Sequence, residues 1–174
     1  MIPGKNVVIV GGGAVGCETA QLLSRNGAIS EEQLMFLTVH QAEEPDVIRT
    51  LVNTSTRNVT IVEIMPKLGS GFDPGCAWPV MKDLKRLKVA THTSSKITEV
   101  TDSFAVIEKT TEAGTERIEI PCDTIILAVG SVSENRLYNE LSQVGANVHI
   151  IGDAGKTGRV LDAIEQALDL ACVI

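Results

Sequence analysis

Short apolar runs rich in β-branched residues recur along the 174-residue chain. Such a run without polar interruption is typical of a strand buried on both faces of a parallel sheet. The sequence therefore predicts parallel strands at residues 6–10, 58–63, 88–94, 123–129 and 147–151. Among these, the runs NVVIV, NVTIVE and DTIILAV are expected to be covered on both faces.

A different pattern begins at Lys96 and continues to about Glu119. Apolar and polar residues alternate there in the segments KITEVT, FAVIEKT and ERIEIP, with turn residues near 101–103 and 112–115. A period of two predicts strands with one covered face and one solvated face. We therefore expect an antiparallel β-meander between two strands of the parallel sheet.

Helical spacing of apolar residues predicts helices at residues 17–26, 76–87 and 159–171. Gly27 follows the first of these helices, where a glycine commonly ends a helix. In the last helix Leu161, Ile164 and Leu168 share one stripe, which we expect to pack in a hydrophobic core.

The segment 28–57 separates the first predicted helix from the second predicted strand. Ser30 and Gln33 stand at the spacing of a capping box, and Pro45 suits the first turn of a second helix. These signals predict a helical insertion outside the parallel sheet.

A glycine-rich motif, GGGAVG, joins the first predicted strand to the first predicted helix. Gly11, Gly13 and Gly16 form G-x-G-x-x-G, in which the glycines allow a tight turn, the approach of a pyrophosphate and close packing of helix on strand. The N–H groups of a helix N-terminus then favour bound phosphate. The motif predicts a dinucleotide site, with Ala14 and Val15 also in contact with the cofactor.

The second predicted strand ends at Glu63, where a carboxylate can accept hydrogen bonds from the adenosine ribose hydroxyls. Ile64, which follows it, is expected at the same site. The usual spacing between motif and acid is about 20 residues, and the insertion explains the longer distance. An acid here favours NAD over NADP, although nearby Lys67 keeps NADP open. The alternative is that Glu63 only caps the strand edge.

Composition narrows the possible partners and location. The formal net charge of −7 opposes binding to the phosphates of nucleic acids or of an anionic membrane. Four widely spaced cysteines form no C-x-x-C pair, so neither a zinc site nor a redox dithiol is indicated. Reduced thiols and the lack of a long apolar run favour a cytoplasmic protein.

Several strings together resemble a known family: VVIVGGGAVGCETAQLL, VTIVEIMPKLG, DTIILAVGS and HIIGDAGKTGRVLDAIEQALDLA. They are similar to the C-terminal region of the NADH:flavin oxidoreductases, such as dienoyl-CoA reductase, enoate reductases and trimethylamine dehydrogenase. These lie within the wider pyridine nucleotide–disulfide oxidoreductase superfamily. The resemblance implies an α/β, Rossmann-like FAD/NAD(P)-binding fold with a meander crossover and the helical insertion.

The resemblance also implies a division of the chain. Residues 1–130 match an NAD(H)-binding domain, in which Gly130 is a further expected cofactor contact. Residues 131–174 match the last piece of an FAD-type domain, where Gly152 and Asp153 would reach the ribityl chain of FAD. FMN and an iron–sulfur cluster would belong to a barrel elsewhere in the full-length protein.

These expectations make the chain an NAD(H)-binding fragment of a flavin-dependent oxidoreductase. Its partners would be NADH and the flavin and barrel domains of a longer parent polypeptide, from which both ends look cut. No catalytic side chain is assigned, because nicotinamide and flavin carry hydride transfer, and the isolated chain is expected to be inactive. The alternatives are the NAD(P)H domain of a disulfide-reductase-like or NADH-oxidase-like flavoenzyme, and a stand-alone non-catalytic NAD(H)-binding module.

Overall fold

The computed structural model describes residues 2–145 and 147–173 of the chain. It divides into two compact units, Met1–Val129 and Gly130–Ile174. Within the described residues, no helix is both long enough and apolar enough to cross a membrane.

The first unit is built on a parallel sheet with the strand order β3-β2-β1-β7. Its strands pair in parallel and in register, so that Val8 lies opposite both Thr60 and Ile125. The strands are β1 (Asn6–Val10), β2 (Asn58–Val62), β3 (Ala90–His92) and β7 (Thr124–Leu127). The parallel sheet predicted for this part of the sequence is confirmed.

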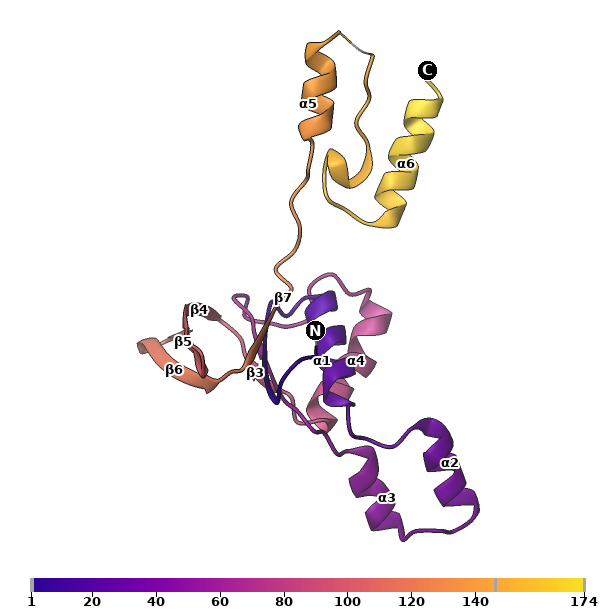
Figure 1. Cartoon of the computed structure of the whole chain (residues 1–174), viewed down its shortest axis with the longest axis vertical. Helices are drawn as coiled ribbons and strands as arrows, with labels where there is room; N and C mark the ends of the chain where they lie inside the picture. The colour runs from indigo at the N-terminus through magenta and orange to yellow at the C-terminus, as the bar shows by residue number, and fades with distance from the viewer. Residues whose placement is uncertain (1, 146, 174) are drawn as a thin grey trace. The chain divides into compact units, whose positions relative to one another are not determined.

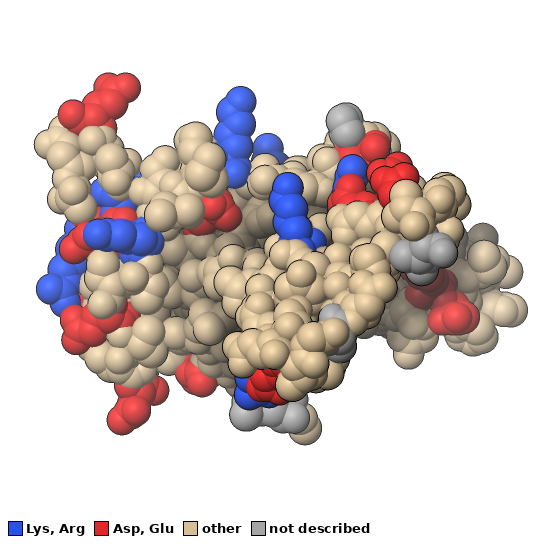
Figure 2. All heavy atoms as spheres, turned by 90° about the horizontal axis from the view of Figure 1, so that it is seen from above, with Lys and Arg blue, Asp and Glu red and all other residues tan. Residues whose placement is uncertain are grey.

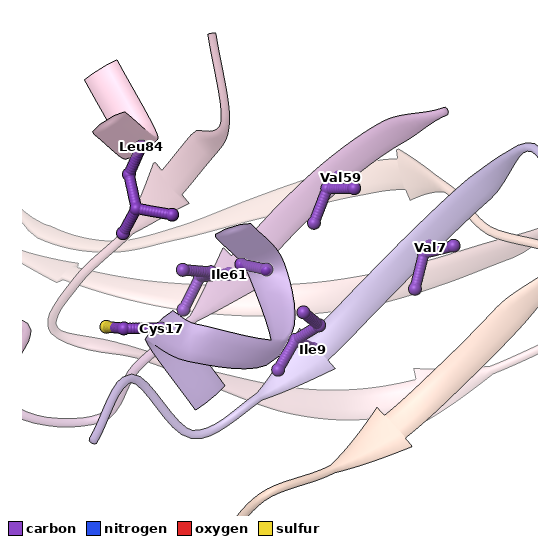
Figure 3. Close-up of a cluster of buried hydrophobic side chains, with 7 residues drawn as sticks. Val7, Ile9, Cys17, Val59, Ile61 and Leu84 are labelled. Carbon is purple, nitrogen blue, oxygen red and sulfur yellow. The ribbon is translucent and has the colours of Figure 1, made fainter. Parts of the chain in front are cut away.

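Two helices, α1 (Ala14–Ser24) and α4 (Pro74–Arg86), cover one face of this sheet. Side chains from the sheet and both helices meet there in a core that excludes water (Figure 3). Its labelled members are Val7, Ile9, Cys17, Val59, Ile61 and Leu84. Helix α1 begins at Ala14, three residues before the predicted start, because it continues directly from the glycine motif.

An antiparallel meander covers the other face of the sheet (Figure 1). Its strands are β4 (Ser95–Val100), β5 (Phe104–Thr111) and β6 (Gly114–Pro121), in the order β4-β5-β6. Val8 and Val62 of the parallel sheet pack there against Ala105 and Ile107 of β5. The central strands β1 and β2 are therefore buried on both faces, as their uninterrupted apolar sequence predicts.

Strand β7 differs from the expectation. It lies at the edge of the sheet, and Leu127 is 72% exposed. The outer side of β7 has no partner strand among the described residues of the first unit, so its apolar sequence does not lead to full burial.

The insertion forms two helices, α2 (Glu31–Val39) and α3 (Pro45–Val52), as predicted. The capping box is present, since Ser30 and Gln33 each bond the other's backbone N–H, and Pro45 opens α3. A backbone hydrogen bond of 2.8 Å from Thr56 to Asn26 joins the two ends of the insertion. Residues 28–57 can therefore leave the sheet and return without disturbing the pairing of β1 with β2.

The second unit contains helices α5 (Arg136–Gln143) and α6 (Val160–Ala171) and a short 3-10 helix at Gly152–Ala154. Two expectations are wrong here. Residues 147–151 form no strand, because the described part of this unit offers no strand to pair with. Leu161, Ile164 and Leu168 are more than half exposed, because none of the described elements of this unit covers their stripe.

One carboxylate connects α1, α4 and the insertion. Asp83 of α4 accepts hydrogen bonds from Gln21 (2.8 Å), from Arg25 and from Arg86 (3.1 Å). Arg86 also donates to the Asn53 side chain at the end of α3, at 2.8 Å. Partial burial raises the pKa of Asp83, but these hydrogen bonds outweigh it and hold the pKa at about 2.

We expect Asp83→Ala to lower the free energy of unfolding by about 1–3 kcal/mol, because several donors lose a charged acceptor. The folded-state pKa lies below the ordinary value of 3.8. The stabilisation is therefore fully present above about pH 4 and is lost as the pH falls towards about 2. Urea denaturation at neutral and acidic pH measures both effects.

Asp46→Ala is the control, because Asp46 pairs with Arg49 on an exposed surface where its side chain is 88% exposed. Its expected effect is within about 0.5 kcal/mol. Equal destabilisation by the two substitutions at neutral pH would contradict the role given to Asp83.

Candidate dinucleotide site

The glycine motif lies between the end of β1 and the start of α1. Because β1 is a central strand of a parallel sheet, this places the motif at the carboxyl edge of the sheet, where such folds bind their ligands. The sequence and the structure agree on this strand–loop–helix order.

Two of the glycines are required by close packing. Gly11 has a φ of +104°, and a Cβ on it would overlap the carbonyl oxygen of Ala128. A Cβ on Gly16 would overlap the carbonyl oxygen of Gly11. The first turn of α1 therefore sits directly against the end of β1, and only glycine allows this approach.

Gly13 has a different position. It is the N-cap of α1 with an extended backbone, φ −71° and ψ −172°, so its conformation alone does not demand glycine. A Cβ there would lie 3.1 Å from the carbonyl oxygen of Ser70. The N–H groups of Gly13, Val15 and Gly16 donate no hydrogen bond to the described part of the chain, and they are the donors that a phosphate could use.

Glu63 follows β2 and is only 8% exposed. One carboxylate oxygen accepts a hydrogen bond from the N–H of Gly12, and the other accepts one from the N–H of Met65 at 2.7 Å. Each oxygen keeps a further lone pair for another donor. The expected ribose acid thus lies against the glycine loop, and the neighbouring Ile64 is 69% exposed.

The sequence interpretation missed three residues that touch this loop. A Cβ on Gly12 would overlap a methyl group of Leu68, and Ala14 donates its N–H to Ser70 at 3.0 Å. The buried Cys17 thiol donates to the carbonyl oxygen of Gly12 at 3.3 Å. Burial raises the pKa of the Cys17 thiol, so it stays protonated and able to donate. The closely spaced Gly69 and Gly71 were the available signal for a tight segment here.

The remaining predicted site residues belong to the second unit. Gly130 and Gly152 have φ values of +91° and +61°, which favour glycine. Asp153 accepts a hydrogen bond from the N–H of Gly158 at 3.1 Å, and Gly152 donates to Gln166 at 2.8 Å. The structure thus brings Gly11, Gly13, Ala14, Val15, Gly16, Glu63 and Ile64 together in one unit. Gly130, Gly152 and Asp153 lie in the second unit.

The residues of the first unit fit a bound nucleotide. The loop has no side chain where the backbone must turn. N–H groups without a partner among the described residues lie at a helix N-terminus, and a buried carboxylate stands beside them. This combination of phosphate donors and ribose acceptor is what the ADP half of a dinucleotide requires.

Curated relatives resemble nearly the whole chain. It is 40% identical over 168 residues to a metal reductase of Desulforamulus reducens, covering 97% of this chain and 25% of the relative. It is 27% identical over 169 residues to an NADH oxidase of Thermoanaerobacter brockii, covering 96% of this chain and 21% of the relative. The chain therefore spans a quarter or less of the length of these proteins.

Solved structures show the same fold. A 2-naphthoyl-CoA reductase structure matches 94% of this chain and 20% of its own with a TM-score of 0.66, at 19% identity. The family model for pyridine nucleotide-disulphide oxidoreductases matches residues 1–160. The observed fold is the Rossmann-like FAD/NAD-binding fold of this family. The chain therefore belongs to the pyridine nucleotide-disulphide oxidoreductase family, whose members use FAD and NAD(P).

Proposed function

We propose that the glycine loop and Glu63 bind the ADP half of NADH. The observation that carries this proposal is the position of the buried Glu63 carboxylate, which is hydrogen-bonded to Gly12 inside the loop. In this arrangement the N–H groups of Gly13, Val15 and Gly16 hold the pyrophosphate, and Glu63 accepts from the ribose hydroxyls. Ala14 and Ile64 belong to the same proposed contact set.

The carboxylate also supports a preference for NADH over NADPH. A 2′-phosphate would bring further negative charge next to Glu63, whose side chain is itself largely shielded from water. The ion pairs of the described residues include none between Lys67 and Glu63, so the carboxylate is not neutralised by its nearest lysine in sequence.

Within the family, the resemblance of the quoted strings favours an NADH:flavin oxidoreductase of the enoate or dienoyl-CoA reductase kind. When bound, the nicotinamide supplies a hydride for a flavin. This chain's own residues bind and orient the cofactor, and none of them needs to donate or accept a proton. We assign residues 131–174 to an FAD-type domain, where Gly152 and Asp153 contact FAD, and FMN and an iron–sulfur cluster to the rest of the parent protein.

The proposed partners are NADH and the flavin and barrel domains of the parent polypeptide. Charge argues against nucleic acid and against an anionic membrane surface. Among the residues coloured in Figure 2, Lys and Arg side chains stand in small groups interleaved with Asp and Glu. With a net charge of −7, this arrangement gives a polyanion little to bind.

An NADH-oxidase-like flavoenzyme is the second candidate, because one relative over nearly the whole chain is an NADH oxidase. The site in the first unit would be unchanged, and only the electron acceptor would differ. A non-catalytic NAD(H)-binding module would also use this site, but the FAD-type motif at Gly152 and Asp153 favours a flavoenzyme.

We expect the 174-residue chain to bind NADH more tightly than NADPH in calorimetric titrations. Glu63→Ala should weaken NADH binding by about 1–3 kcal/mol, because the ribose hydroxyls lose their acceptor. Glu63→Gln keeps an acceptor and removes the charge, so it should reduce the difference between the two cofactors.

Glu99→Ala is the control, since Glu99 pairs with Arg117 on the exposed meander. It should leave both affinities unchanged. Equal or tighter binding of NADPH by the unmodified chain would show that Glu63 is not the ribose acid.

We expect the purified chain to be colourless and unable to reduce dyes with NADH. FAD needs a glycine cradle for its own ADP half, and the G-x-G-x-x-G cradle here is followed by the strand that ends in Glu63. Contacts from Gly152 and Asp153 alone cannot offset the entropy lost when so large a ligand is immobilised. An absorption spectrum after gel filtration measures this. Flavin bands that survive would mean that the chain holds a complete flavin site.

A further inference from the structure

A short segment between β2 and α4 lies across the glycine loop. We call this segment, residues 68–72, the strap. Gly69 of the strap donates its N–H to the carbonyl oxygen of Gly12 at 2.7 Å. The carbonyl oxygen of Ser70 accepts the N–H of Ala14 at 3.0 Å. Two backbone hydrogen bonds therefore connect the strap to the loop and to the first turn of α1.

The strap is anchored at both ends. Leu68 and Phe72 are partly buried and pack against the core between the sheet and the helices α1 and α4. Gly69 and Gly71, between these anchors, have φ values of +87° and +89°, which glycine adopts without strain. The anchored ends and the two glycines with positive φ together favour one position of the Ser70 carbonyl.

The strap also limits what can occupy position 12. A Cβ on Gly12 would overlap Leu68 and would lie 3.0 Å from the Cβ of Glu63. Gly12 stands between Gly11 and Gly13, and a side chain at this position would have to displace Leu68 and would crowd Glu63. The strap, the loop and the ribose acid are therefore packed as one group.

We propose that the strap is a fixed wall of the dinucleotide site that positions the glycine loop. Its Ser70 carbonyl continues to accept the Ala14 N–H when the cofactor is bound. This inference rests on the proposed function. The pyrophosphate of NADH is then held by the N–H groups of Gly13, Val15 and Gly16, without that of Ala14. The Ser70 carbonyl stays in place when NADH binds, and the strap acts as a positioning element for the loop.

The test compares Gly71→Ala with Gly114→Ala in the full 174-residue chain. Both glycines have positive φ, +89° and +127°, and a Cβ on either would meet nothing within 4 Å. Each substitution therefore strains the backbone without a steric clash, one in the strap and the other at the meander turn between β5 and β6. The pair separates a change in the site from a general loss of stability.

We expect Gly71→Ala to weaken NADH binding about tenfold, because the strap must leave its left-handed conformation. Gly114→Ala should lower stability and leave the NADH dissociation constant unchanged. Gly71→Asn should retain more affinity than Gly71→Ala, since asparagine tolerates positive φ better. Equal weakening by the alanine variants at 71 and 114, or none by Gly71→Ala, would overturn the proposal.

Amide hydrogen exchange of the unmodified chain gives a second readout that needs no variant. The Ala14 N–H should be protected in the free protein and should stay protected with NADH bound. Loss of its protection on binding would mean that the strap moves away, and free exchange without NADH would mean that it is not fixed. If the unmodified chain binds no NADH at all, the proposed function fails and this inference fails with it. NADH binding with an unprotected Ala14 removes the strap proposal alone.

Discussion

The site depends on the close approach of α1 to the end of β1. The carbonyl oxygen of Gly11 occupies the space that a side chain at Gly16 would need. This approach brings the first N–H groups of α1 to the carboxyl edge of the sheet, next to the end of β2, where Glu63 stands. The first N–H groups of α1 and the Glu63 carboxylate are neighbours because two central strands pair in register and a helix starts within a few residues of one of them.

Much of the first unit could be predicted because the signals are local. The apolar run of β1, the glycine motif and the capping box at Ser30 each determine structure within a few residues of themselves. The alternation of apolar and polar residues in the meander predicts that one face of each strand is covered. Glu63 could be placed beside the glycine loop although the insertion lengthens its spacing, because the insertion leaves the sheet and returns at Thr56.

The remaining features depend on contacts that sequence periodicity does not encode. Residues 147–151 have the composition of a strand, but a strand needs a partner for its backbone groups, and the described residues of the second unit offer none. The stripe on α6 is apolar but exposed. Its burial could not be predicted, because periodicity shows which face of a helix is apolar and does not show what covers that face. The contact of Leu68 with Gly12 joins segments more than fifty residues apart. Gly69 and Gly71 indicate a tight turn beside Leu68, but they do not indicate what that turn contacts.

In the proposed function, the amides at the start of α1 hold the phosphates of a dinucleotide beside Glu63. Titration of the isotope-labelled chain with ADP-ribose, followed by NMR, probes this arrangement, because it reports on each amide and needs neither flavin nor hydride acceptor. We expect saturable shifts of the signals of Gly13, Val15 and Gly16, with no comparable shift at Gly152. Binding that shifts Gly152 and leaves the first-turn amides of α1 unchanged would contradict it.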